Sequence, residues 1–199
     1  MFTGMMPVTR ALVLTCGLAY LLQLLTGDSL AIHLALWPVH GDPYYPPFQP
    51  WQLVSYAFLH GGFTHLAFNM FALYMFGSEI ERLLGTRRYL AYYTVCVIGA
   101  ALAQLAVAQL SGGEPRPTVG ASGGIFGLLL AYGMAFPQRR LILLFPPIPM
   151  RAWVFVTLYG LVELVLGVTG TQAGVAHFAH LGGMVAGFLL ITFWRARRT

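Results

Sequence analysis

Ser122 and His180 are the two residues whose type and surroundings could support chemistry in this chain. Ser122 lies in the segment GASGG at 120–124, and His180 lies in HFAHLGG at 177–183, each within a strongly apolar stretch. A serine hydroxyl becomes an effective nucleophile when a histidine takes its proton. Polar groups inside membrane-spanning segments are costly and mark functional sites by default. The two segments therefore predict a nucleophile–base pair that works within a membrane.

The composition is that of an integral membrane protein. Of the 199 residues, 58% are hydrophobic and only 9% are charged, whereas about a quarter of a soluble domain is charged. We expect one all-α domain over residues 1–199, with no separate soluble domain. The net charge of +5 comes from eleven arginines and no lysine. They cluster at the ends of apolar segments, so we interpret them as membrane anchors and expect no nucleic-acid partner.

Six apolar segments are candidates for membrane-spanning helices, because about twenty residues cross a bilayer. They cover roughly residues 8–26, 64–84, 88–110, 119–136, 151–168 and 175–194. The first has no convincing small-residue cleavage site after it, so we expect a retained helix and not a cleaved signal peptide. The sequence thus predicts a bundle of six transmembrane helices.

The arginines predict the orientation of this bundle. Alternate connections and both ends of the chain carry them, and Arg116 is the one that falls on the opposite side. Basic residues are retained on the cytoplasmic side of membranes. We therefore expect both termini in the cytoplasm, which agrees with an even number of crossings.

Four polar residues on three predicted helices lie at a common depth. Ser122, His180, His65 and Asn69 precede the arginine that ends their own span by 17, 15, 17 and 13 residues. At 1.5 Å per residue, they stand about 25, 22, 25 and 20 Å above those arginines. That level is below the outer surface of a hydrocarbon core about 30 Å thick and above its midplane. The shared depth predicts a shared site.

Glycines next to the two reactive residues would let their helices approach closely. Gly123 and Gly127 follow Ser122, and Gly183 and Gly187 follow His180, each pair at the GxxxG spacing that brings membrane helices into backbone contact. The alternative is that these glycines serve packing alone. Acyl transfer also needs donors for an oxyanion, which the first backbone N–H groups of the 119–136 helix could supply.

The combination of motifs resembles the rhomboid intramembrane serine proteases. GASG at 120–123, AHLGG at 179–183 and HLAFN at 65–69 are similar to the GxSG, AHxxG and HxxxN motifs of that family, in the family's order along the chain. The resemblance covers about residues 8–195. It implies a six-helix rhomboid-like bundle. The supporting motif glycines would be Gly120, Gly123 and Gly183.

The resemblance also implies a role for each polar residue. Ser122 would be the nucleophile and His180 the general base. His65, Asn69 and the backbone N–H of Ser122 would form the oxyanion hole. Phe126 stands where the family has an aromatic ring against the catalytic histidine. Two alternatives remain: Asn69 as an interhelical hydrogen-bonding residue, and Phe126 as a lipid-facing or core residue.

Several other polar residues compete for roles in this site. His177 is nearly on the same helical face as His180, and only the AHxxG match favours His180. Glu163 could complete a catalytic triad, although the family resembled uses a Ser–His dyad. The alternative for Glu163 is a buried group that bonds another helix or stays neutral. His60 lies near His65, but HExxH is absent, so we expect neither a metal nor a cofactor. His33 and His40 are interpreted as loop residues.

The first connection, about residues 27–63, contains many aromatic residues and prolines and no basic residue. We expect an ordered loop that lies partly in the outer membrane interface. Many bacterial rhomboids have Trp-Arg in this loop, where this chain has Trp51-Gln52, so an arginine partner for Glu81 is absent there. Anchoring of the loop is thereby put in question. Cys16 and Cys96 are interpreted as small buried residues without a disulfide.

The predicted function is an intramembrane serine endopeptidase that cleaves transmembrane segments near their outer end. Its partners would be transmembrane protein substrates and the lipid bilayer. The connection 168–174, with glycines near both ends, is a candidate mobile lid. A bacterial plasma membrane is the expected location. The alternatives are a non-catalytic rhomboid-like protein that binds or escorts membrane clients, and a small transporter.

Overall fold

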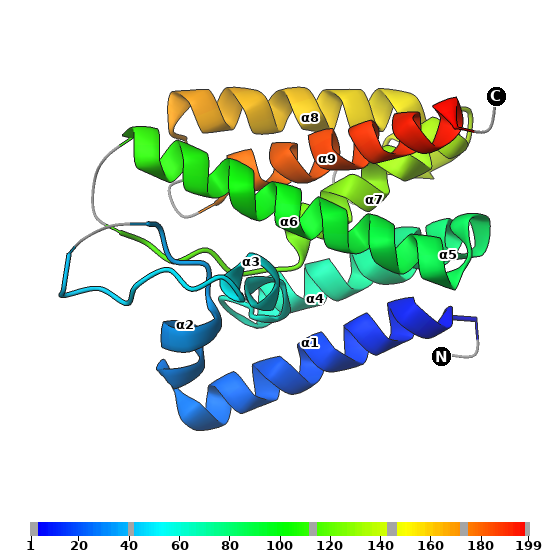
Figure 1. Cartoon of the computed structure of the whole chain (residues 1–199). Helices are drawn as coiled ribbons and strands as arrows, with labels where there is room; N and C mark the ends of the chain where they lie inside the picture. Colours follow the sequence, from blue (N-terminus) through cyan, green and yellow to red (C-terminus); the bar gives the residue numbers. More distant parts are fainter. Residues whose placement is uncertain (1–3, 40–41, 112–114, 143–146, 172–174, 198–199) are drawn as a thin grey trace.

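The computed structural model of the chain is built almost entirely of helices (Figure 1). It describes residues 4–39, 42–111, 115–142, 147–171 and 175–197. The longer elements are α1 (Pro7–Thr26), α4 (Phe63–Ala72), α5 (Ser78–Leu84), α6 (Thr86–Ser111), α7 (Ser122–Ala135), α8 (Ala152–Thr169) and α9 (His177–Ala196). The short ones are α2 (Ser29–Leu34), α3 (Gln52–Ser55), the 3₁₀ turn η1 (Tyr56–Phe58), the π turn η2 (Leu73–Gly77), and the strands β1 (Arg140–Ile142) and β2 (Pro149–Arg151).

All six ranges predicted as membrane spans are helical, with ends that differ from the prediction by three residues at most. Among the described residues, α1, α6, α8 and α9 are each long and apolar enough to cross a membrane. The fourth predicted range, 119–136, began three residues too early. Gly120 has a φ of +126°, a conformation outside the helical region that favours glycine. As a result, α7 starts at Ser122 and is only 14 residues long.

The short helix α7 lies in the middle of the bundle. Most of its side chains are buried, and it packs against α6, α8 and α9. In Figure 1 it begins part-way along the length of α6 and α8, while α1 and α8 lie at opposite edges. These two edge helices expose many leucines and valines, which suits a surface that contacts lipid. Ser122, the first residue of α7, thus stands inside the bundle.

The predicted 64–84 helix forms one helical run from Phe63 to Leu84, with the π turn η2 in its middle. Beyond this turn, the buried carboxylate of Glu81 accepts hydrogen bonds from the backbone N–H groups of Val8 and Thr9, at 3.0 and 2.8 Å, and from the Thr9 hydroxyl. The first N–H groups of a helix lack intrahelical partners and attract negative charge. Glu81 therefore holds the start of α1 without an arginine.

The first connection is ordered, but it is not a simple loop, because α2, α3 and η1 lie within it. Gln52 is 1% exposed. Its Oε1 accepts the backbone N–H groups of Trp37 and Gln49, and its Nε2 donates to the carbonyl oxygen of His33. The Gln52 side chain thus anchors the connection, because its amide group bonds three parts of it. An arginine at this position is not needed for that.

This connection also holds the segment that leads into α7. Leu36 and Thr118 exchange two backbone hydrogen bonds, at 3.0 and 2.9 Å, and the N–H of Gly120 donates to the carbonyl oxygen of Tyr56. The Tyr56 hydroxyl in turn donates to the carbonyl of Val97 in α6. The position of Ser122 at the start of α7 therefore depends on contacts that begin more than sixty residues earlier in the chain.

The start of α1 and the end of α9 lie at the same end of the molecule, and α2 lies at the other end (Figure 1). Near the first end, Glu79 forms ion pairs with Arg82 and Arg139, at 2.8 and 2.9 Å. The strands β1 and β2 pair antiparallel between α7 and α8. The all-α prediction missed this ribbon, because each strand has only three residues and no clear alternation of polar and apolar side chains.

Candidate active site

Ser122 and His180 are brought together by the packing of α7 against α9. The Oγ atom of Ser122 lies 2.8 Å from Nε2 of His180, although 58 residues separate them in the chain. His180 is 9% exposed and sits in the first turn of α9. A hydroxyl and an imidazole nitrogen at this distance share a hydrogen bond along which a proton can pass. The two segments predicted this approach, and the catalytic roles of the two residues stay a prediction.

Backbone contact between α7 and α9 makes this approach possible. A Cβ atom on Gly183 would lie 1.9 Å from the carbonyl oxygen of Gly123, and one on Gly123 would lie 2.4 Å from the Cβ of Ala100 in α6. A Cβ on Gly127 would lie 2.3 Å from Sγ of Cys96. At each of these positions, the side chain of a larger residue would overlap neighbouring atoms. Cys96 and Cys16 are both buried and unpaired, as expected.

Phe126, one helical turn beyond Ser122, stacks directly on the catalytic candidate His180. The two rings are 4.2 Å apart between centroids and 5° from parallel. Phe126 also stacks on Tyr159 of α8, at 5.2 Å and again 5° from parallel. The imidazole is thus held flat against an aromatic ring. Phe126 is 7% exposed, so it lies in the core of the protein and does not face lipid.

His65 stands beside the loop that precedes Ser122. A Cβ on Gly120 would lie 2.8 Å from the Cε1 and Nε2 atoms of its ring, so the absence of a side chain at Gly120 makes room for this imidazole. Nδ1 of His65 accepts the backbone N–H of Gly61, at 3.3 Å. Asn69 is buried, and its Nδ2 donates along its own helix to the carbonyl of His65, at 2.9 Å. The structure thus brings His65 to the site, while the bond of Asn69 runs along α4.

Glu163 is the residue whose place in the site the sequence left open. Its carboxylate lies inside the bundle on α8, and the same oxygen, Oε2, is 2.8 Å from Nδ1 of His180 and 2.7 Å from Nδ1 of His177. The side chain is 7% exposed. Two signals in the sequence pointed to it: Glu163 is the acid well inside an apolar span, and the two histidines are one helical turn apart. What spacing alone could not give is the rotation of α8 that turns Glu163 inward.

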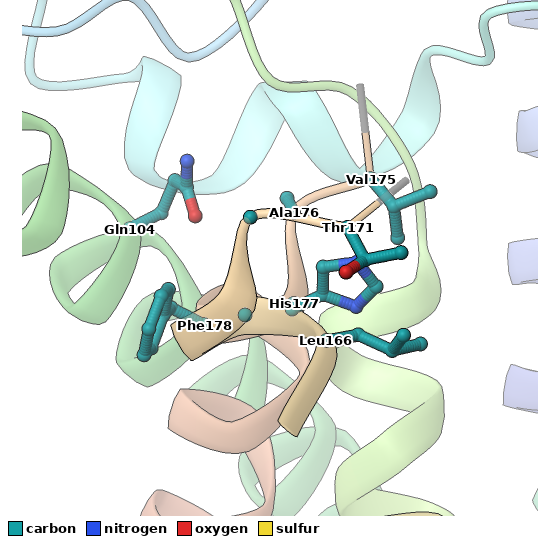
Figure 2. Close-up of a pocket in the computed structure, with 9 residues that line it drawn as sticks. Gln104, Leu166, Thr171, Val175, Ala176, His177 and Phe178 are labelled. Atoms are coloured by element: carbon teal, nitrogen blue, oxygen red, sulfur yellow. The ribbon is translucent and has the colours of Figure 1, made fainter. Parts of the chain in front are cut away.

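His177 borders a cavity of about 130 Å³ between α6, α8 and the start of α9, where Gln104 and Thr171 also lie (Figure 2). Such a volume has room for several water molecules. The Nε2 atom of His177 is buried and has no hydrogen-bond partner among the described residues. Glu163, His177 and His180 offer ligand atoms within 4.8 Å of one another, and the expectation of no metal stays a prediction.

The remaining histidines lie outside this arrangement. His60 is buried against His65, with ring centroids 5.2 Å apart. Its burial, reinforced by the neighbouring His65, lowers its pKa to about 4. His33 was expected in a loop, but it lies in α2 and bonds the carbonyl of Ser29. His40 lies outside the described residues.

The first two residues of the predicted lid are helical. Val168 and Thr169 belong to the last turn of α8, and Gly170 caps that helix with a φ of +66°. Residues 172–174, which complete the predicted lid, lie outside the described residues. The lid itself stays a prediction.

A model of the Rhomboid domain matches residues 47–197. The chain is 28% identical over 193 residues to the Rhomboid protease GlpG of Yersinia pestis (strain Pestoides F), covering 97% of this chain and 64% of that protein. It is 29% identical over 191 residues to the Rhomboid protease GlpG of Serratia proteamaculans (strain 568), covering 96% and 63%.

The chain thus spans a little under two thirds of the length of these relatives. The domain model nevertheless matches well over half of the chain. This multi-pass integral membrane protein therefore belongs to the rhomboid family.

Proposed function

We propose that this protein is an intramembrane serine endopeptidase that cleaves transmembrane segments of other membrane proteins near their outer end. The observation that carries the proposal is the 2.8 Å contact between Ser122 Oγ and His180 Nε2 inside a bundle of apolar helices. Two relatives bear the name Rhomboid protease, which supports the same reaction class. A non-catalytic client-binding rhomboid would not need a nucleophile bonded to a base.

The reaction begins when a lone pair of Ser122 Oγ attacks the carbonyl carbon of the substrate. The hydroxyl proton passes to Nε2 of His180, and the C=O π electrons move to the carbonyl oxygen. Collapse of the tetrahedral species breaks the C–N bond, and His180 returns the proton to the leaving nitrogen. The acyl-enzyme is then hydrolysed by water, with His180 again as the base.

The developing oxyanion needs donors that are already in place. Ser122 begins α7, and the first hydrogen bond within that helix runs from Ile125 to Ala121, so the N–H groups of Ser122 and the next two residues lack helical partners. The positive end of the helix dipole lies there too. Together with His65 and Asn69, the N–H of Ser122 forms the proposed oxyanion hole.

In the proposed orientation both termini are cytoplasmic, and the first connection lies on the outer side. The distribution of arginines supports this, and so does the position of the start of α1 and the end of α9 at one end of the molecule (Figure 1). A substrate segment enters from the lipid, and helix-breaking residues near its outer end expose the peptide bond. The bacterial relatives support a location in a bacterial plasma membrane.

A panel of transmembrane substrates incubated with purified protein in liposomes tests the proposal, with cut sites mapped by mass spectrometry. We expect Ser122→Ala and His180→Ala to abolish cleavage while both variants remain folded. Ser78→Ala serves as the matched control, because Ser78 is also a buried serine on a helix. A fluorophosphonate should label wild-type protein at Ser122, and a chelator should leave cleavage unchanged. Undiminished cleavage by Ser122→Ala would overturn the assignment.

A further inference from the structure

The buried carboxylate of Glu163 holds the imidazole of the proposed base from the side opposite the nucleophile. Oε2 of Glu163 is 2.8 Å from Nδ1 of His180, and Nε2 of the same ring is 2.8 Å from Ser122 Oγ. Carboxylate, imidazole and hydroxyl therefore form one continuous chain of hydrogen bonds across α8, α9 and α7. Both carboxylate and imidazole are almost completely buried, so neither contact is an exposed pair weakened by solvent.

We propose that Glu163 is a positioning residue for His180, and that His177 positions Glu163 by donating to the same carboxylate oxygen. The site would then work as a Glu–His–Ser triad, beyond the dyad that the sequence resemblance implies. The inference rests on the proposed function, because it assigns Glu163 a role in the reaction of Ser122. It also explains why an ionisable acid is placed inside an apolar helix, where an unpaired charge would be costly.

The first consequence of this contact is the choice of tautomer. An ionised carboxylate only accepts hydrogen bonds, so Nδ1 of His180 must carry the proton. Nε2 then presents its lone pair to Ser122, as a general base requires. When Nε2 takes the serine proton, the imidazolium lies next to the Glu163 carboxylate, which stabilises it. Glu163 keeps its charge throughout and takes no proton, and the ring returns its proton to the leaving nitrogen from Nε2.

His177 completes the arrangement on the far side of the carboxylate. Its Nδ1 is 2.7 Å from the same Oε2 atom, and its ring is nearly perpendicular to that of His180, at 88°. Two N–H donors on one oxygen keep that oxygen between them, which limits rotation of the Glu163 side chain. The N···O distances are those of charge-assisted hydrogen bonds. This gives His177 a role that its position one turn before His180 does not by itself reveal.

A competing explanation is that Glu163 only joins α8 to α9 and stabilises the fold. The two roles differ in their effect on the reactivity of Ser122. Among the described residues, the other titratable groups around that ring are His177 on its own helix, His65 on α4 and Tyr159 on α8. None of these is an anion at neutral pH. Loss of Glu163 therefore removes the carboxylate that contacts this ring, and a purely structural role would not couple that loss to the reactivity of Ser122.

The test is the rate at which a fluorophosphonate labels Ser122 in detergent-solubilised full-length protein, measured between pH 5 and 9. For Glu163→Gln we expect a rate about 10²-fold lower at neutral pH. The acidic limb of the pH profile should also change, because the carboxylate that faces the imidazole is gone. Glu163→Asp, which keeps the charge on a shorter stem, should recover part of the rate and the wild-type limb. A wild-type rate and limb in folded Glu163→Gln would overturn the proposal.

Glu163→Gln could unfold, so a second variant keeps the inference open to refutation. In Glu163→Leu with His177→Leu, both members of that buried pair become apolar, so the one donor left without its acceptor is Nδ1 of His180. We expect this double variant to fold and to label slowly. Wild-type labelling by it would show that the carboxylate serves the fold alone.

Glu81→Gln is the matched control, because Glu81 is also a buried carboxylate with several hydrogen bonds but lies in α5 against α1. It should lower thermal stability. The protein that remains folded should show the same acidic limb in its pH profile of labelling as the wild type. The proposed function fails separately from this inference. If Ser122→Ala still cleaves, the function is wrong. If Ser122→Ala is inactive and Glu163→Gln is unaffected, only the positioning role is wrong.

Discussion

A Cβ atom on Gly183 would lie 1.9 Å from the carbonyl oxygen of Gly123. The backbones of α7 and α9 are thus in direct contact just beyond the two reactive residues. Gly123 follows Ser122 in the chain, and Gly183 is three residues after His180. Because both helices are rigid over so short a distance, this contact sets the separation of the serine oxygen from the imidazole nitrogen.

Gly183→Ala should therefore be severely disruptive. The added methyl group would meet backbone atoms that cannot move aside, so α9 must shift away from α7, at a cost of several kcal/mol. We expect a clear fall in thermal stability and loss of fluorophosphonate labelling. Gly17→Ala is the control, since nothing lies within 4 Å of a Cβ at that position of α1. Equal stability of the two variants would contradict the close-contact argument.

The stack of Phe126 on His180 should affect the rate of the reaction more than the fold. Phe126→Leu removes a parallel ring 4.2 Å from the imidazole, an interaction worth about 1 kcal/mol. The looser imidazole should lower kcat roughly 10-fold. Phe126→Tyr should retain activity. Phe155→Leu, which removes the ring stacked on the far side of Tyr159, should leave kcat near the wild-type value, and a comparable loss there would refute the specific role of Phe126.

Gln52 should be essential for the stability of the first connection. Gln52→Ala leaves the buried N–H of Trp37 and the part-buried N–H of Gln49 without their acceptor, at a cost of about 2 kcal/mol. We expect a lower Tm and faster proteolysis within residues 27–63. Gln138→Ala, at an exposed position, should change neither. If Gln52→Ala is as resistant to proteolysis as the wild type, another contact anchors the connection.

His60 should make the protein less stable in acid. Burial lowers its pKa from 6.5 to about 4, so the unfolded chain binds a proton that the folded chain does not. Above about pH 6.5 the free energy of unfolding is not reduced by this group. It falls as the pH falls toward 4, by up to about 3 kcal/mol.

The comparison is the Tm of wild type and His60→Leu between pH 7 and 4.5. The variant should lose less stability on acidification, whereas His33→Leu, at an exposed position, should behave like the wild type. A parallel decline of His60→Leu and wild type would rule out His60 as the group responsible.

The helical ranges could be predicted closely because apolar length and arginine placement report on the membrane itself. The same counting brought Ser122, His180 and His65 to one depth, and the structure gathers these three side chains. Depth is one coordinate, however, and the rotation of each helix about its axis is another. That is why the direction of Glu163 could not be predicted: it depends on how α8 packs against α9, which no periodicity in its nearly uniform apolar sequence reports.

The first connection illustrates a second limit. Its composition predicted order but not the helices α2 and α3, which are only six and four residues long and are stabilised by tertiary contacts more than by their own propensity. Gln52 was noticed as a departure from a familiar pattern. Its actual partners are backbone groups of Trp37, Gln49 and His33, and only folding brings these together.

The π turn at Leu73–Gly77 sets the relative orientation of the two ends of a single helical run. A π turn holds one more residue than an α turn, so everything beyond it is rotated by about 100° relative to a regular helix. On one side of the turn His65 faces the loop of Gly120, and on the other Glu81 faces the start of α1. Deleting one residue here would restore a regular α-helix and rotate either His65 or Glu81 away from its present contacts. The exposed positions of this segment, Tyr74 and Met75, should therefore tolerate substitutions far better than the segment tolerates changes in length.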